Sequence, residues 1–204
     1  MKRFLWLALV LAAVPAVLAA GGRTFVMVPA GDVEPGLAES VRAYMQDNAE
    51  VVVRLAAPVP LVPGQDLEAL GRAAAQTVTK ADFAVIVLAQ PVDDQPLDAC
   101  NPQEHYAVIN LARLASGPDD KSHLERRAGQ MGLRLMARLL GMTPCPFPLC
   151  VLVGFDRVEE LDGMSGNFCP PCRDRLLRLA RKAGVALAGD AAMDPAPLER
   201  PATE

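Results

Sequence analysis

Histidine is scarce in this sequence, which contains only His105 and His123 among its 204 residues. A catalytic zinc centre built on imidazole needs two or three histidines at suitable spacing, and these two have no third partner. We therefore expect both to lie at the surface without binding a metal. The chain has five cysteines, however, so a zinc site built on cysteine remains open.

An excess of positive charge is also missing. The chain has 20 Lys and Arg against 24 Asp and Glu, and its isoelectric point is near 5.3. Proteins that bind nucleic acid or anionic membranes usually carry a net basic footprint, so from the net charge we predict no nucleic-acid partner and give an anionic membrane partner low priority. With 51% hydrophobic and 22% charged residues, the composition excludes a mainly disordered chain and predicts one globular domain, or two at most.

Residues 1–19 have the layout of a signal peptide. Lys2 and Arg3 precede an uncharged run over residues 4–20, and Val17 and Ala19 suit cleavage after Ala19. The run is shorter than the roughly 20 apolar residues that a membrane anchor needs. We therefore expect a periplasmic or secreted protein with no stable membrane insertion after cleavage.

Patterns of strand and helix alternate through residues 20–141. The chain order begins β-α-β-α-β, which predicts an α/β or α+β fold with helices packed on a sheet. Residues 90–103 read as a loop. Strands are expected at 23–30, 50–57, 82–89 and 106–111, and helices at 34–45, 66–78 and 122–140.

Residues 142–188 have a different texture, rich in cysteine and proline, and predict a small C-terminal subdomain. A short helix is expected near 156–161, and a longer one after Cys172 to about Lys182. Residues 189–204 contain much Ala and Pro without periodicity, which predicts a disordered tail.

Four of the cysteines form two close pairs. Four residues separate Cys145 from Cys150, and two separate Cys169 from Cys172. Two such knuckles can complete a tetrahedron of thiolates around one zinc ion, leaving no open coordination position. We therefore predict one structural zinc ion bound by these four residues.

Export leaves two other interpretations of the cysteines open. In an oxidising compartment the four could form two disulfides. Alternatively, Cys169 and Cys172 at the start of a helix resemble a thiol-disulfide exchange site, which would make the protein a dithiol oxidoreductase. The fifth, Cys100, lies far from the others in sequence, and we expect a small, partly buried side chain with no assigned role.

The run over residues 124–150, followed by residues 167–173, resembles the archaemetzincin family of zinc metallopeptidases. That family carries the motif H-E-x-x-H-x-x-G-x-x-H, then C-x4-C-x-M and later C-x2-C. Gly141 matches the motif glycine, and the four paired cysteines match the two knuckles. Residues 106–114 resemble the strand before the family's active-site helix. The resemblance covers residues 24–184 and implies a zincin-like mixed sheet packed with helices, plus a four-cysteine zinc subdomain.

The residues at the family's catalytic positions differ from the motif. Arg134 and Arg138 stand where the two helical histidines would be, Leu135 where the general base would be, and Pro144 where the third histidine would be. A guanidinium has no lone pair for zinc, and leucine cannot activate water. Although the resemblance implies a metallopeptidase, these residues predict an inactive one.

Arg127, Arg134 and Arg138 fall on one stripe of the expected helix. The stripe is typical of an amphipathic helix with a solvated basic face. An alternative hypothesis is that Arg134 and Arg138 line the former substrate cleft and bind an acidic protein or peptide ligand. We thus expect an exported, inactive archaemetzincin-like protein with a binding role, the alternatives being a metallopeptidase with unconventional ligands or the dithiol oxidoreductase.

Overall fold

The computed structural model describes residues 22–62, 64–90, 95–115 and 121–190. The signal peptide expected at residues 1–19 and residues 191–204 of the expected tail lie outside the described residues. In chain order the elements are β1 (Thr24–Gly31), α1 (Pro35–Ala49), β2 (Val53–Leu55), α2 (Leu67–Ala75), β3 (Asp82–Gln90), β4 (Asp98–Asn101), β5 (Tyr106–Asn110), α3 (Leu111–Leu114), α4 (Lys121–Leu139), α5 (Glu160–Gly163) and α6 (Pro170–Lys182).

The five strands form one mixed sheet in the order β2-β1-β3-β5-β4. The first four run parallel, and β4 joins the edge antiparallel to β5. Strand β3 is central and covered on both faces, so its residues from Asp82 to Ala89 are buried. For the same reason nearly all of its side chains are apolar. The expectation of a mixed sheet packed with helices is confirmed.

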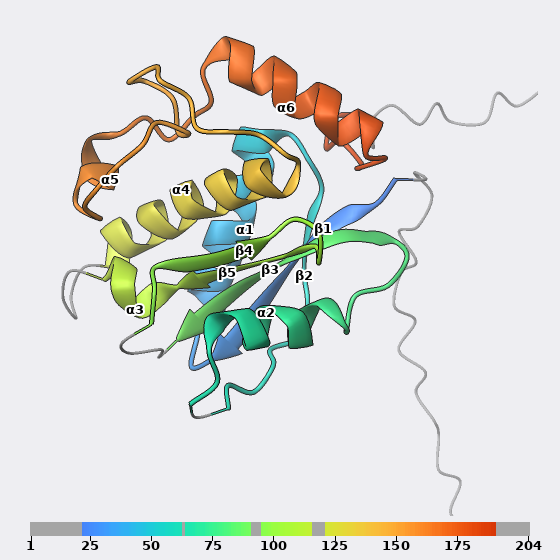
Figure 1. Ribbon diagram of the computed structural model, residues 1–204, viewed down its shortest axis with the longest axis vertical. Coiled ribbons are helices and arrows are strands. Elements are labelled where there is room, and N and C mark those ends of the chain that lie inside the picture. The colour runs from blue at the N-terminus through green and yellow to red at the C-terminus, as the bar shows by residue number, and fades with distance from the viewer. Residues whose placement is uncertain (1–21, 63, 91–94, 116–120, 191–204) are drawn as a thin grey trace, which may run out of the picture.

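Helices cover both faces of this sheet (Figure 1). Successive side chains of β1 point to opposite faces of the sheet. Val26 and Val28 pack with α2 on one face, whereas Phe25 and Met27 pack with α1, α4 and the C-terminal segment on the other. The C-terminal segment, residues 142–188, therefore shares its core with α1 and α4. No helix in the described part of the chain is long and apolar enough to cross a bilayer.

Two glycines bring α1 and α4 close together. A side chain on Gly129 would meet the ring of Tyr44, and one on Gly132 would meet Met45. At its other end α4 ends at Leu139, and Gly141, two residues later, has a φ of +80° in the left-handed region that favours glycine. The N–H of Met142 then reaches the carbonyl of Ala137, which closes the helix and turns the chain toward the first cysteine knuckle.

The expected loop over residues 90–103 is partly wrong, because residues 98–101 form β4. This strand has the sequence Asp-Ala-Cys-Asn and every residue is half-buried, so it lacks the alternation that marks a strand. The expected strand 50–57 is also shorter, and α3 follows β5 directly where no helix was expected. The other long elements agree with their expected ranges within about four residues at each end.

Asp82, at the start of the central strand β3, is hydrogen-bonded to the edge strand β2. Its carboxylate accepts hydrogen bonds from Arg54 on β2 (Nε–Oδ1 2.9 Å) and from the backbone and hydroxyl of Thr79. Burial alone would raise the pKa of Asp82, but these hydrogen bonds outweigh it and lower the pKa to about 2. The ionised carboxylate is therefore a stabilising group of the folded state.

We expect Asp82→Asn to lower the free energy of unfolding by about 2 kcal/mol at neutral pH. The folded pKa is depressed, so the contribution is complete above the ordinary pKa of 3.8 and disappears as the pH falls through about 2. Urea unfolding of both proteins between pH 7 and pH 2.5 would measure the difference. A difference that stays constant over this range would contradict the assignment to Asp82.

Candidate metal centre

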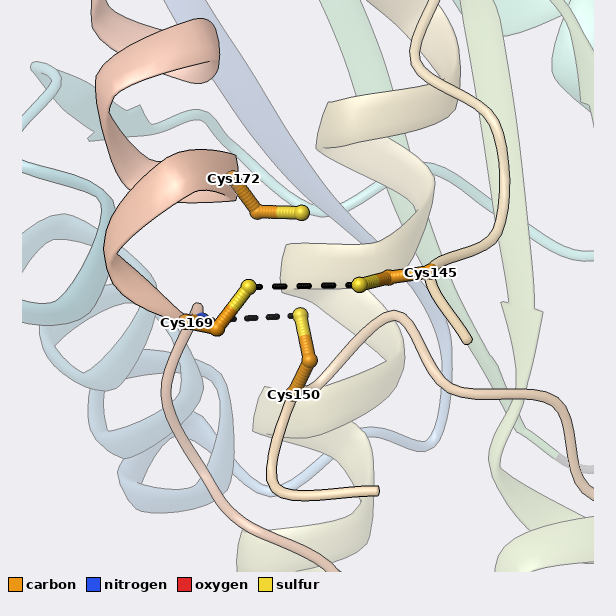
Figure 2. A group of neighbouring side chains, drawn as sticks. All are labelled: Cys145, Cys150, Cys169 and Cys172. Carbon is orange, nitrogen blue, oxygen red and sulfur yellow. Dashed lines mark hydrogen bonds between the residues drawn. The ribbon is translucent and has the colours of Figure 1, made fainter. Parts of the chain in front are cut away.

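The four paired cysteines come from three places in the fold and converge beside α4 (Figure 2). Cys145 and Cys150 flank the loop that follows α4, Cys169 is the residue before α6, and Cys172 is in its first turn. A hydrogen bond from the Cys145 N–H to the Leu152 carbonyl (3.0 Å) closes the first knuckle. The structure therefore brings together the four residues predicted from their spacing.

Their geometry fits one zinc ion. The four Sγ atoms all lie within 4.8 Å of one another, and those of Cys145 and Cys169 are 3.9 Å apart. Zinc–sulfur bonds of about 2.3 Å in a tetrahedron place the sulfurs about 3.8 Å apart. Two disulfides would instead need sulfur pairs at about 2.05 Å, and none of the four is bonded to another in this structure. The four-cysteine group could hold one metal ion.

The thiols occupy unequal environments. The backbone N–H of Cys172 is the main influence on Cys169 and lowers the pKa of its thiol. Burial raises the pKa of Cys150, and burial together with the neighbouring thiols raises the pKa of Cys172. A divalent cation at the centre would favour the thiolate form of all four, since metal binding releases thiol protons. The backbone N–H of Cys169 also donates to Sγ of Cys150 (3.5 Å), the kind of outer contact that orients a ligand.

Cys100 lies apart from this group, on β4. Its side chain is half-buried, and burial raises the pKa of its thiol to about 11. The expectation of a small, partly buried residue is confirmed. A thiol that is almost entirely protonated at neutral pH is a poor nucleophile.

Arg134 lies on α4 and binds the chain segment that follows the first cysteine knuckle. Its Nη1 donates to the carbonyls of Val151 (2.6 Å) and Val153 (2.7 Å), and its guanidinium lies over the ring of Phe155, 4.7 Å from the centroid. Burial lowers the pKa of Arg134, yet a guanidinium stays protonated at any physiological pH. The side chain thus ties α4 to the chain that follows Cys150.

Arg138, one turn further along α4, pairs with a different element. Its Nη1 is 2.6 Å from Oδ2 of Asp98 on the edge strand β4, and about half of the side chain is exposed. The structure therefore points the two arginines to separate partners. Arg138 is the more accessible of the two, and an anionic ligand at this position would have to share or replace Asp98.

The expectation of a solvated basic face is wrong for Arg127. This residue is only 2% exposed, and it forms a two-point pair with Asp162 of α5 (Nε–Oδ1 2.8 Å) and donates to the Leu114 carbonyl (2.7 Å). The pair lowers the pKa of Asp162. Helical periodicity alone could not reveal it, because Asp162 lies on a separate element of the C-terminal segment.

No protein-family model matches the chain. A curated archaemetzincin from Methanopyrus kandleri is 33% identical over 78 residues, which are 38% of this chain and 43% of that protein. The sequence match thus spans less than half of the length of the curated relative.

Solved structures match over a larger part of the chain. The crystal structure of archaemetzincin from Methanopyrus kandleri aligns with a TM-score of 0.65 and 20% identity, over 81% of this chain and 99% of that chain. A zinc-dependent peptidase from Methanocorpusculum labreanum aligns with a TM-score of 0.62 and 21% identity, over 74% of this chain and 99% of that chain. Identities this low show the fold.

The chain is a mixed α/β protein whose four-cysteine group, beside its long helix, could hold one metal ion. In fold, and in part of its sequence, it is archaemetzincin-like, as the resemblance in its sequence predicted.

Proposed function

We propose that this chain is an exported archaemetzincin-like protein that does not hydrolyse peptides, keeps one structural zinc ion and acts by binding. The observation that carries the proposal is that the α4 side chains at the catalytic positions of the family motif are already hydrogen-bonded or buried within the protein. Arg134 and Arg138, which take the positions of the two helical histidines in the family motif, are held by backbone carbonyls and by Asp98. Leu135, at the position of the general base, is fully buried in the core.

The chemistry of these residues supports the loss of hydrolysis. Peptide hydrolysis by a metzincin needs neutral imidazoles that hold zinc and a carboxylate that takes a proton from water. A guanidinium supplies neither function, and it repels a divalent cation. The four cysteines would saturate their own zinc ion, which leaves that ion no position for water or substrate.

Analysis of the purified protein tests the proposal. We expect one zinc ion per chain, four thiols that react only after the metal is removed, and no cleavage of casein. A second zinc ion together with cleavage that chelator abolishes would establish a metallopeptidase with unconventional ligands. Absence of zinc with a reducible disulfide between Cys169 and Cys172 would establish the dithiol oxidoreductase. Either result would overturn the proposal.

The proposed ligand is an acidic protein or peptide that meets α4 near Arg138. The side chain of Arg138 is about half exposed, its guanidinium has donors that the single contact with Asp98 does not use, and carboxylates are its natural partners. In the same preparation a polyglutamate peptide is expected to bind at low salt, and more weakly after Arg138→Ala. Binding that is unchanged by this substitution would exclude the α4 face as the ligand site.

The proposal of export rests on residues 1–19 and on their match to a signal peptide. The N-terminal sequence of the protein recovered from the periplasm or medium of an exporting bacterium would begin at Ala20. A protein that keeps Met1 and stays in the cytosol would contradict it.

A further inference from the structure

The loop between Cys145 and Cys150 presents an apolar tip to solvent. Its four residues, Pro-Phe-Pro-Leu, are all exposed, and Phe147 and Leu149 are 47% and 65% exposed. Within the described part of the chain, the other exposed large hydrophobic side chains are Leu55 (38%) and Val62 (57%). Cysteines of the metal centre hold the loop at both ends, and the Cys150 N–H bonds the Phe147 carbonyl (3.1 Å). We name residues 146–149 the knuckle tip.

Helix α6, which begins at the same metal centre, has a strongly basic outer face. It carries five basic residues and one acidic one, a charge of +4, although the whole chain has a charge of −4. Arg173 pairs with Glu50, whereas the other four form no ion pair among the described residues. The remaining four are all exposed: Arg175, Arg178, Arg181 and Lys182. We name these four residues the α6 basic face.

The knuckle tip and α6 are both attached to the four-cysteine group, the tip through Cys145 and Cys150 and the helix through Cys169 and Cys172. Cys172 points into the metal centre, where its Sγ lies within 4.8 Å of that of Cys145 (Figure 2). Residues three, seven and ten positions later on a helix continue the stripe that Cys172 begins. Arg175 and Lys182 are on this stripe, and Arg178 is next to it on the exposed side. The metal centre therefore brings an apolar tip close to the start of a cationic helix.

We propose that the knuckle tip and the α6 basic face together bind the surface of an anionic phospholipid bilayer. An aromatic and an aliphatic side chain on a rigid, uncharged loop suit insertion at the level of the headgroups. Arginine and lysine beside the loop suit the negative surface, and each contributes separately to binding. An acidic protein partner would explain the cations but would leave the exposed, uncharged tip without a function. Peripheral binding of this kind requires no membrane-spanning helix.

The opposite sign of the rest of the chain orients this contact. Outside α6 the full chain carries a net charge of −8, which follows from −4 for the whole chain and +4 for the helix, and removal of Lys2 and Arg3 with the proposed signal peptide makes it −10. An anionic bilayer repels that part and attracts α6, so the protein binds with one face and does so more weakly as salt screens the charges. This proposed contact uses neither Arg138 nor Arg134 of α4, and the inference holds whether or not the chain is catalytic.

Vesicle sedimentation tests the inference on the protein as an exporting host releases it. We expect binding to vesicles of phosphatidylcholine with phosphatidylglycerol and little binding to phosphatidylcholine alone. Arg178→Glu is expected to lower the partition coefficient about tenfold, and Leu149→Ser about fivefold. Lys80→Glu and Val62→Ser are the matched controls, because they change one exposed cation and one exposed apolar side chain elsewhere. Both controls are expected to bind like the unmodified protein.

Three results would overturn the inference. The first is failure of the unmodified protein to bind anionic vesicles. The second is equal loss of binding in Arg178→Glu and Lys80→Glu, which would reduce the effect to net charge. The third is binding to a polyanion such as heparin that depends on Arg178, with no vesicle binding, which would assign α6 to an acidic polymer. Circular dichroism of each variant separates loss of binding from loss of fold.

Discussion

Replacing Cys150 by serine is expected to abolish retention of zinc and to lower the free energy of unfolding by at least about 3 kcal/mol in zinc-containing buffer. The side chain of Cys150 is fully buried. Its Sγ is one of four possible ligand atoms that lie within 4.8 Å of one another. The free energy of metal binding contributes directly to folding when the unfolded chain has no preformed site. Urea unfolding with metal analysis of the folded fraction would measure both quantities.

Cys100→Ser is the matched control, because it also converts a shielded thiol to a hydroxyl but lies outside the metal centre. It is expected to keep one zinc ion per chain. Chelator separates loss of the metal from loss of packing: in its presence the Cys150→Ser protein should differ much less from the unmodified one. Equal destabilisation with and without zinc would mean that Cys150 serves the core alone.

The metal centre could be predicted from the sequence because ligand spacing constrains geometry directly. Four residues between Cys145 and Cys150, and two between Cys169 and Cys172, leave few conformations other than knuckles, and the structure brings all four together. The buried strands and long helices were predictable for a similar reason. A strand covered on both faces, such as β3, must be apolar along its length, and a helix such as α4 shows its period.

Features that depend on contacts between distant segments could not be predicted. The edge strand β4 has neither an apolar run nor alternation, and its identity comes from pairing with β5. The three arginines of α4 do lie on one stripe of the helix, as the sequence predicted. The helical period cannot, however, predict which other segments of the chain contact that stripe. Arg127 meets Asp162, Arg134 meets two carbonyls beyond Cys150, and Arg138 meets Asp98. One stripe thus has three environments, set by three other segments.

Arg127 is the arginine whose loss should have the largest effect. We expect Arg127→Met to lower the free energy of unfolding by about 2 to 3 kcal/mol, since it removes the buried partner of an ion pair whose other member, Asp162, is partly exposed. Among the described residues, the Asp162 carboxylate would lose its arginine partner and keep the contact with the His123 ring (3.4 Å), and the Leu114 carbonyl would lose its donor. The substitution should loosen α5 and α3 from α4, because these contacts cross between the three helices.

Two further variants identify the cause of this loss. Arg157→Met removes a largely exposed arginine that precedes α5 and pairs with Glu160, in the helix that also carries Asp162. This substitution is expected to leave the free energy of unfolding nearly unchanged. Arg127→Met combined with Asp162→Leu is expected to recover part of the stability, because no uncompensated charge remains under the helix. If the double variant were less stable than Arg127→Met by the full cost of a second independent loss, the two side chains would not act as a pair. Coupling would instead show that an ion pair with a buried arginine, at a position where the sequence indicates a solvated face, holds the C-terminal segment against α4.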